Sequence, residues 1–330
     1  IMSHEFKKFI NNKINITSKK YSLILGLKPS EGARSPKIWN KFYNKLKIDC
    51  KMYPADLSNK NLKNLVICIK KDSSFVGAAV TMPYKETITK HIDILDKFAK
   101  KIGSINTIVR EDNKLKGYNT DYLACKNLIN KFKNKKKILV LGLGGAGKAV
   151  LVATIEIFRN KEIIVFNRDI KKVKKFLKSF NEKKIKILKN YDSLAKLKKI
   201  DLVINSTSVG FDLWQKNKKG FFNLKFFSPL SNLNKIAEVK TKNEKKFLNI
   251  NQKLLISNSN QTELFFKTNQ KASIIDIIYQ PLKTKLIRIS KAKKIKTENG
   301  LKINKLQAIK AFILANKISN SKIRNKILSI

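Results

Sequence analysis

The chain has 330 residues, of which 42% are hydrophobic, so it is long and apolar enough for two ordinary domains, and overall disorder is excluded. Its 72 lysines and arginines against 23 acidic residues give a formal net charge of +49, which by itself indicates a basic nucleic-acid-binding protein. Only six of the cations are arginines, however, and the lysines are spread along the whole chain, so nucleic acid is not an expected partner and stays a remote alternative.

The first part of the chain alternates between apolar runs and amphipathic stretches. Residues 21–27 form an apolar run, and a helix with apolar residues at helical spacing is expected from Pro36 onward. A strand at 50–55, a helix at 57–70 and a β-rich run at 75–82 follow. Strands and helices that alternate at this spacing predict an α/β domain with a mainly parallel sheet.

A second series of strands and helices begins at Ile138. A buried strand, a glycine turn and a helix are expected over residues 138–158. Three further strands are expected at residues 162–167, 184–188 and 201–207. Residues 211–271 are polar, rich in Lys and Asn and weakly periodic, so we interpret them as an insertion or an elaborated loop region. A strand at 274–279 and a C-terminal helix with a broad apolar face follow.

The glycine turn of the second series carries the motif G-x-G-x-x-G between a strand and a helix. Gly142 permits the tight turn, Gly144 lets the backbone approach a pyrophosphate, and Gly147 allows close packing of helix against strand. Gly145 and Ala146 complete the turn, and the helix N-terminus attracts the negative charge of phosphates. This context predicts a Rossmann-type domain that binds a dinucleotide.

The residues after the next strand indicate which dinucleotide binds. About twenty residues beyond the last glycine, where an NAD enzyme has an acidic residue, the chain has Asn167 and Arg168. A cation there accommodates the 2′-phosphate of NADP, and Lys172 could extend the pocket. Asp169 would repel the same phosphate. NADP is therefore expected as the cofactor, with NAD the less favoured alternative.

The remaining composition excludes several classes of site. Cys50, Cys68 and Cys125 form no C-x-x-C pair, and the chain has two histidines, so neither a disulfide framework nor a metal centre is expected. No apolar run reaches the ~18 to 20 residues that span a bilayer. We expect a cytoplasmic protein with no membrane partner and no metal.

Several motifs together resemble those of one known family. They are VTMPYKE, SINTIV, GYNTD, GLGGAGKA, FNR, INSTSVG, DIIYQPLKT and NGL followed by Gln307-Ala308. In order and spacing they resemble the shikimate dehydrogenase family, from about Tyr21 to Ala315. The resemblance implies an NADP-dependent oxidoreductase that acts on CH–OH groups and reversibly reduces 3-dehydroshikimate to shikimate, in the chorismate route to aromatic amino acids.

The resemblance also implies roles for residues at matching positions. Lys85 and Asp121 would form the catalytic pair, in which Lys85 donates or withdraws the proton at the developing alkoxide and Asp121 holds and tunes the ammonium. The implied substrate-binding residues are Ser35, Thr81, Asn106, Tyr279 and Gln307. The implied cofactor-binding residues are Gly142, Gly144, Gly145, Ala146, Gly147, Asn167, Arg168, Lys172 and Thr207.

The implied architecture has two α/β domains. Residues 1–121 with 301–330 would form the substrate-binding domain, to which the C-terminal helix returns, and residues 122–300 the Rossmann NADP-binding domain. The protein is expected to bind a small anionic substrate as a monomer or a homodimer. Ala33, Trp39 and Ala79 depart from the family pattern, which leaves open a paralogue that acts on quinate, an aminoshikimate or another cyclic hydroxy acid.

Overall fold

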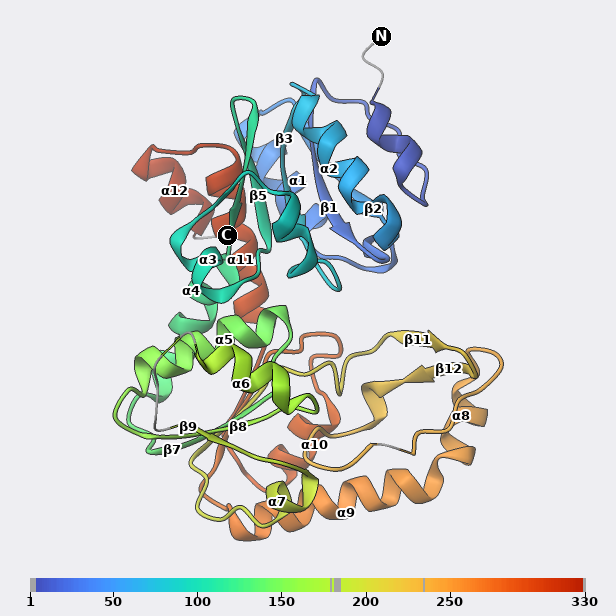
Figure 1. Ribbon diagram of the computed structural model, residues 1–330, viewed down its shortest axis with the longest axis vertical. Helices are drawn as coiled ribbons and strands as arrows, with labels where there is room; N and C mark the ends of the chain where they lie inside the picture. Colours follow the sequence, from blue (N-terminus) through green and yellow to red (C-terminus); the bar gives the residue numbers. More distant parts are fainter. Residues whose placement is uncertain (1–3, 179, 181–184, 234, 329–330) are drawn as a thin grey trace. The chain divides into compact units, whose positions relative to one another are not determined.

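The computed structural model describes residues 4–178, 180, 185–233 and 235–328 (Figure 1). The chain divides into two compact units, Ile1–Cys125 with Ile303–Ile330 and Lys126–Lys302. The C-terminal segment thus returns to the first unit, and the expected α/β class is confirmed, with one six-stranded sheet in each unit.

A six-stranded mixed sheet forms the centre of the first unit, in the order β2-β1-β3-β5-β6-β4. Its strands are β1 (Lys20–Gly26), β2 (Cys50–Asp56), β3 (Phe75–Val80), β4 (Ile94–Leu95), β5 (Thr107–Glu111) and β6 (Lys114–Tyr118). Three of the five pairings are parallel, and β5 is antiparallel to both of its neighbours. The carboxyl ends of β1 and β3 therefore open toward the same edge of the sheet.

Helices cover both faces of this sheet. They are α1 (Ser35–Leu46), α2 (Leu62–Lys71), α3 (Lys97–Ile102), α11 (Leu301–Ala315) and α12 (Ser321–Leu328). A further helix, α4 (Thr120–Ile129), begins in this unit and continues into the second. Leu23 and Leu25 of β1 pack with α2, whereas Ile24 packs with α1 and α11. This division follows from the alternation of side chains along a strand. Burial of apolar side chains on both faces is what fixes α11, from the end of the chain, against the N-terminal sheet.

The second unit is built on a six-stranded sheet in which every pairing between described strands is parallel. The strand order is β14-β13-β10-β7-β8-β9. The strands are β7 (Lys137–Leu141), β8 (Glu162–Phe166), β9 (Ile185–Ile187), β10 (Leu202–Asn205), β13 (Ser273–Asp276) and β14 (Thr297–Asn299). The order reverses between β7 and β10, and an open α/β sheet binds ligands at such a point.

Two layers of helices enclose this parallel sheet (Figure 1). The helices are α5 (Gly145–Ile157), α6 (Ile170–Lys178), α7 (Tyr191–Ala195), α9 (Gln252–Thr268) and α10 (Lys285–Ala292). A further helix, α8 (Glu244–Ile250), packs through Phe247 with residues 214–239 instead of on the sheet. Leu139 and Leu141 of β7 pack with Phe265 and Phe266 of α9 and with Leu286 of α10. Figure 1 shows α5 and α6 on the opposite face of the sheet from α7, α9 and α10.

Residues 211–271, which the sequence analysis interprets as an insertion or an elaborated loop region, contain regular secondary structure. This segment contains an antiparallel hairpin of β11 (Trp214–Asn217) and β12 (Gly220–Asn223), then α8 and the 17-residue α9. Phe227, Val239 and Phe247 are its fully buried apolar centre. The amphipathic pattern of α9 is blurred because Asn258 and Thr262 are buried while Ile256 and Leu264 are more than half exposed.

Asparagine side chains hold this segment together. Asn258 accepts a hydrogen bond from the Ser228 amide and donates one to the Ser228 carbonyl, both at 2.9 Å. Asn251 pairs in the same way with the amide and carbonyl of Ala237, at 2.8 and 3.0 Å. An amide side chain can replace a strand neighbour in this manner because it carries both a donor and an acceptor. Within the described residues, no helix is long and apolar enough to cross a membrane.

Candidate functional site

A lysine and an aspartate form an ion pair in the first unit. Lys85 follows β3, and Asp121 is the second residue of α4. The Lys85 Nζ donates to Asp121 Oδ2 at 2.5 Å, and the two side chains are 20% and 9% exposed. The carbonyl of Lys85 accepts a hydrogen bond from the Ile105 amide, which fixes the backbone on the lysine side. The ammonium is therefore held in one place while part of it reaches solvent.

Asn106 joins this pair to the C-terminal helix. Its Nδ2 lies 3.0 Å from Asp121 Oδ1 and 3.0 Å from Gln307 Oε1, and its Oδ1 accepts from the Thr120 amide at 2.7 Å. Thr120 Oγ1 in turn donates to the Gln307 carbonyl at 3.0 Å. Lys85, Asp121, Asn106 and Gln307 thus converge in one hydrogen-bonded cluster.

Thr120 belongs to this cluster, although the sequence analysis did not single it out. It follows Asn119 in the GYNTD motif, so its position beside Asp121 was the available signal. Asn119 is 4% exposed, and its Nδ2 donates to the Ser104 carbonyl at 2.9 Å while its Oδ1 accepts from the Tyr122 amide at 3.1 Å. The consequence is that the start of α4, and with it Asp121, is tied to the segment that precedes β5.

The other expected substrate-binding residues lie outside the hydrogen-bonded cluster. Ser35 is buried at the first position of α1. Thr81 follows β3, and its amide donates to the Leu25 carbonyl at 2.8 Å. Its methyl group lies where a side chain at Gly26 would be, so only glycine fits at the end of β1. Tyr279 lies in the second unit, three residues beyond β13.

The three departures from the family pattern all lie in one hydrophobic cluster, together with α1 and α11. Trp39 is fully buried, Ala79 is 6% exposed, and Ala33 is partly buried against them. Trp39 Nε1 donates to the Ala308 carbonyl at 3.1 Å, and its ring meets Phe312 edge-on at 5.5 Å. Trp39 therefore anchors α11 beside Gln307. All three residues contribute to the packing of this cluster.

The glycine turn of the second unit has the geometry of a phosphate-binding loop. Gly142 has a φ of 92°, and a Cβ there would lie 2.8 Å from Thr207 Cγ2. A Cβ at Gly147 would lie 2.9 Å from both the Gly142 carbonyl oxygen and Ser206 Oγ. At Gly144, just before α5, an added Cβ would meet nothing within 4 Å. The open backbone at this helix N-terminus fits a diphosphate.

Asn167 and Asp169 organise the turn after β8. Asn167 Oδ1 accepts from the Leu143 amide at 3.1 Å, and its Nδ2 donates to the Asp169 carbonyl at 3.0 Å. Asp169 Oδ1 accepts from the Lys172 amide at 3.0 Å, so this carboxylate is engaged by the first turn of α6. Arg168 is exposed beside it. The turn therefore offers a cation to a 2′-phosphate while its carboxylate is engaged elsewhere.

A buried carboxylate supports the floor of this loop. Asp276 is fully buried at the end of β13, where it accepts hydrogen bonds from Asn205 Nδ2 at 3.0 Å and Thr284 Oγ1 at 2.7 Å. Burial raises the pKa of Asp276 to about 6, although these hydrogen bonds oppose the rise. Asn205 Oδ1 accepts from Thr207 Oγ1 at 2.7 Å. Thr207 thus links the carboxylate to the glycine turn against which it packs.

Metal-ligating side chains do not gather in the described residues, where no group of three or more His, Cys, Asp or Glu could hold an ion. The three cysteines are free, and Cys50 and Cys125 are buried. The polar groups that do gather are, in the first unit, the ion pair and the amides around it. The glycine turn belongs to the second unit. The first set suits proton transfer, and the second suits binding of a dinucleotide.

Comparison with known proteins agrees with this arrangement. Residues 27–108 match the family described as shikimate dehydrogenase substrate binding domain, and residues 124–218 match shikimate / quinate 5-dehydrogenase. The chain is 32% identical to shikimate dehydrogenase (NADP(+)) of Methanococcus vannielii over 295 residues, which cover 85% of this chain and 86% of that protein. It is 31% identical to the enzyme of the same name from Caldicellulosiruptor bescii, with 84% and 83% covered.

A solved structure shows the same likeness in three dimensions. The crystal structure of shikimate dehydrogenase 1 from Peptoclostridium difficile superposes with a TM-score of 0.67 at 25% sequence identity. The match covers 94% of this chain and 97% of that one. Both units of the chain therefore have counterparts in one known protein.

Proposed function

The chain belongs to the shikimate dehydrogenase family, and we propose that it catalyses the NADP-dependent, reversible reduction of 3-dehydroshikimate to shikimate. The observation that carries the proposal is the Lys85–Asp121 ion pair, joined through Asn106 to Gln307. Such a pair places one exchangeable proton beside groups that can orient a hydroxylated substrate.

The bound cofactor would supply the hydride for the substrate carbonyl carbon in its reduced form, NADPH, and in the reverse direction its oxidised form, NADP+, would accept the hydride. Lys85 donates a proton from Nζ to the carbonyl oxygen as that oxygen gains negative charge, and in the reverse direction it withdraws the hydroxyl proton. Asp121 holds the ammonium in place through the 2.5 Å contact. The neutral amine left after donation regains its proton from solvent, to which the lysine is partly open.

The amide side chains orient the substrate. Asn106 and Gln307 present amide groups next to the ion pair, and amides both donate to and accept from the hydroxyl groups of a cyclic polyol. Ser35, Thr81 and Tyr279 are the further residues that we assign to substrate binding, with Ser35 and Tyr279 toward the carboxylate. Each is a hydroxyl that can donate to a carboxylate oxygen or a substrate hydroxyl.

The cofactor is held by the glycine turn and by the turn after β8. Gly144, Gly145 and Ala146 place backbone at the N-terminus of α5 for the diphosphate. Arg168 and Lys172 flank the 2′-phosphate, because Asp169 turns its carboxylate to the amide of Lys172. This arrangement supports NADP over NAD.

Assays of the purified protein test the proposal directly. Shikimate with NADP at alkaline pH should give a rise in absorbance at 340 nm, and quinate and NAD should give less. Lys85→Met should lower kcat by roughly 10²- to 10⁴-fold, the usual contribution of general acid–base catalysis. Lys90→Met is the matched control, because Lys90 is an exposed lysine five residues away and its loss should leave kcat unchanged.

Two other outcomes would redirect the assignment. Faster turnover of quinate or an aminoshikimate than of shikimate would establish the paralogue, whose support was Ala33, Trp39 and Ala79. Because those three residues pack inside the protein, we consider the paralogue the second candidate function. No turnover of any cyclic hydroxy acid would refute the proposal. Tight, salt-sensitive binding of nucleic acid would then point to the basic binding protein.

The setting of the enzyme follows from the same features. We propose a cytoplasmic enzyme that acts as a monomer or a homodimer on a small anionic substrate. Free cysteines, two of them buried, suit a reducing compartment. Fractionation and light scattering would test the location and the mass.

A further inference from the structure

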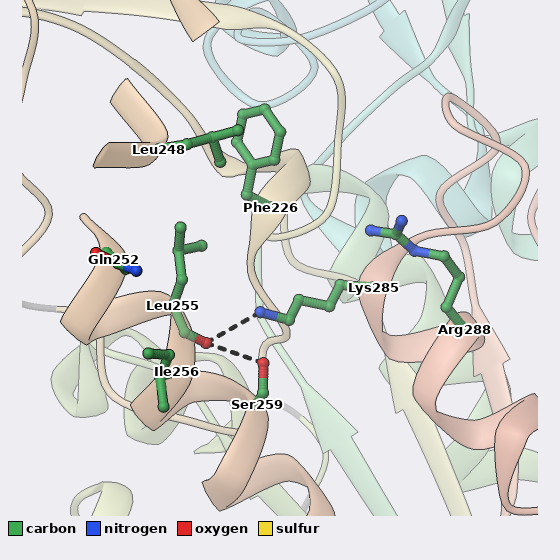
Figure 2. Close-up of a pocket in the computed structure, with 8 residues that line it drawn as sticks. All are labelled: Phe226, Leu248, Gln252, Leu255, Ile256, Ser259, Lys285 and Arg288. Atoms are coloured by element: carbon green, nitrogen blue, oxygen red, sulfur yellow. Dashed lines mark hydrogen bonds between the residues drawn. The ribbon is translucent and has the colours of Figure 1, made fainter. Parts of the chain in front are cut away.

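An open groove of about 340 Å³ lies in the second unit between α9 and α10 (Figure 2). Its apolar surface comes from Phe226, Leu248, Leu255 and Ile256, and its two cations are Lys285 and Arg288. Phe226 and Leu255 also pack against the buried centre of segment 211–271, so the floor of the groove is part of an ordered core. The groove shares no residue with the glycine turn, which lies at the start of α5.

The two cations of the groove stand one turn apart on α10, so they lie on the same face of that helix. In Figure 2 the Lys285 ammonium extends toward Leu255 of α9, whereas the Arg288 guanidinium ends separately, above the Lys285 side chain in this view. Lys285 Nζ donates one hydrogen bond to the Leu255 carbonyl at 3.2 Å, and an ammonium has two further protons to donate. None of the described residues that line the groove is acidic.

This arrangement differs from the ordinary solvated lysines of the surface. Lys285 is only partly exposed, and burial together with the neighbouring Arg288 lowers the pKa of its ammonium to about 8. Two like charges one turn apart destabilise each other, and a bound anion would relieve that repulsion. Binding of an anion between the two cations would therefore be favourable, and contact of an apolar group with the apolar floor would remove apolar surface from water.

We propose that this groove binds a small organic carboxylate with an apolar or aromatic body, separately from the substrate and the cofactor. The carboxylate lies between Lys285 and Arg288, and the guanidinium offers the two parallel donors that match it. The apolar body covers Phe226, Leu255 and Ile256. A cavity of about 150 Å³ holds benzene, so the groove has room for a ring and a short acid chain.

Calorimetric titration of the full-length protein at pH 7 with 3-phenylpropanoate tests the proposal. We expect saturable binding that is unchanged by saturating NADP and shikimate, and little binding of the neutral isostere 3-phenylpropan-1-ol or of inorganic phosphate. Arg288→Gln and Ile256→Asp should each weaken binding roughly 10- to 100-fold, as expected for loss of a charge-assisted contact or for introduction of a like charge. Both side chains are exposed, so neither change should disturb folding.

Lys291→Gln is the matched control, because Lys291 is an exposed lysine on the same helix that does not line the groove. It should bind the probe as the unmodified protein does. Equal binding of the alcohol would show that the site recognises only the apolar body, and equal binding of phosphate would show that it recognises only the negative charge. Either result, the absence of saturable binding, or an equal loss in Lys291→Gln would overturn the proposal.

Discussion

Replacement of Gly147 by alanine should lower the stability of the protein, whereas replacement of Gly144 by alanine should lower its affinity for NADP. At Gly147 an added methyl group lies 2.9 Å from the Gly142 carbonyl oxygen and from Ser206 Oγ, and a backbone oxygen cannot rotate away. Overpacking of this kind costs about 1–3 kcal/mol, and the better helix propensity of alanine returns up to ~1 kcal/mol. Gly147→Ala should therefore destabilise the second unit by roughly 1–2 kcal/mol.

At Gly144 the same methyl group meets no atom within 4 Å, and the φ of −77° is open to alanine. Loss of glycine at a helix N-cap costs less than about 1 kcal/mol, so Gly144→Ala should fold normally. The methyl group would, however, occupy the space through which the diphosphate approaches α5. Loss of one charge-assisted contact should raise the KM for NADP by roughly 10- to 100-fold.

Thermal unfolding and initial rates separate these two effects. Gly147→Ala should lower Tm by about 2–4 °C for each kcal/mol, whereas Gly144→Ala should keep Tm within about 2 °C and lose affinity for NADP. The KM for shikimate of Gly144→Ala should be unchanged, which serves as an internal control. A Gly144→Ala protein that binds NADP normally would refute the placement of the diphosphate, and a fully stable Gly147→Ala protein would refute the packing argument.

Three further predictions concern charge. Arg168→Gln should lower kcat/KM for NADP by roughly 10- to 100-fold and leave kcat/KM for NAD unchanged. An equal loss with both cofactors would show that Arg168 does not bind the 2′-phosphate. The KM for NADP should rise with ionic strength, because the net charge of +49 attracts an anionic cofactor through a field that salt screens. A KM that does not depend on salt would show that the excess of lysine does not contribute to cofactor binding. Because the pKa of Asp276 is raised to about 6, its protonated form favours folding, so this group should lower the unfolding free energy by up to about 3 kcal/mol as pH rises from about 4 through 6. Urea unfolding should show that this part of the pH dependence disappears in Asp276→Asn, and an unaltered profile would contradict the assignment.

Local signals correctly predicted three strands of the first sheet, β1, β2 and β3, and five of the second, β7, β8, β9, β10 and β13, whereas β4, β5, β6 and β14 were not predicted. The helix expected from Pro36 is α1, and the strand expected at 138 is β7. The helix expected at 57–70 begins instead at Leu62, after a short 3-10 turn at Asn59–Asn61. These elements bury one apolar face or a short apolar run, so hydrophobic periodicity is enough to find them.

The helices and the hairpin of segment 211–271 were not predicted, because the order of this segment rests on side chains that carry no apolar pattern. Asn251 and Asn258 each pair with the backbone of a residue far away in sequence, and α9 buries Asn258 while it exposes Ile256. At these two positions asparagine has a structural role. Such pairings depend on which backbone groups come close, and a single sequence does not contain that information.

By itself, the sequence determined the α/β class, the glycine turn and the family resemblance, since each depends on residues that are close along the chain. Only the tertiary structure decided that Lys85, Asp121, Asn106 and Gln307 share one hydrogen-bonded cluster, because Gln307 lies 201 residues beyond Asn106. It also decided that Trp39 is a core residue that holds α11 and that Asp169 turns its carboxylate to an amide of α6. The physical reason is that burial and hydrogen bonding act between residues that are near in space, whatever their separation in sequence.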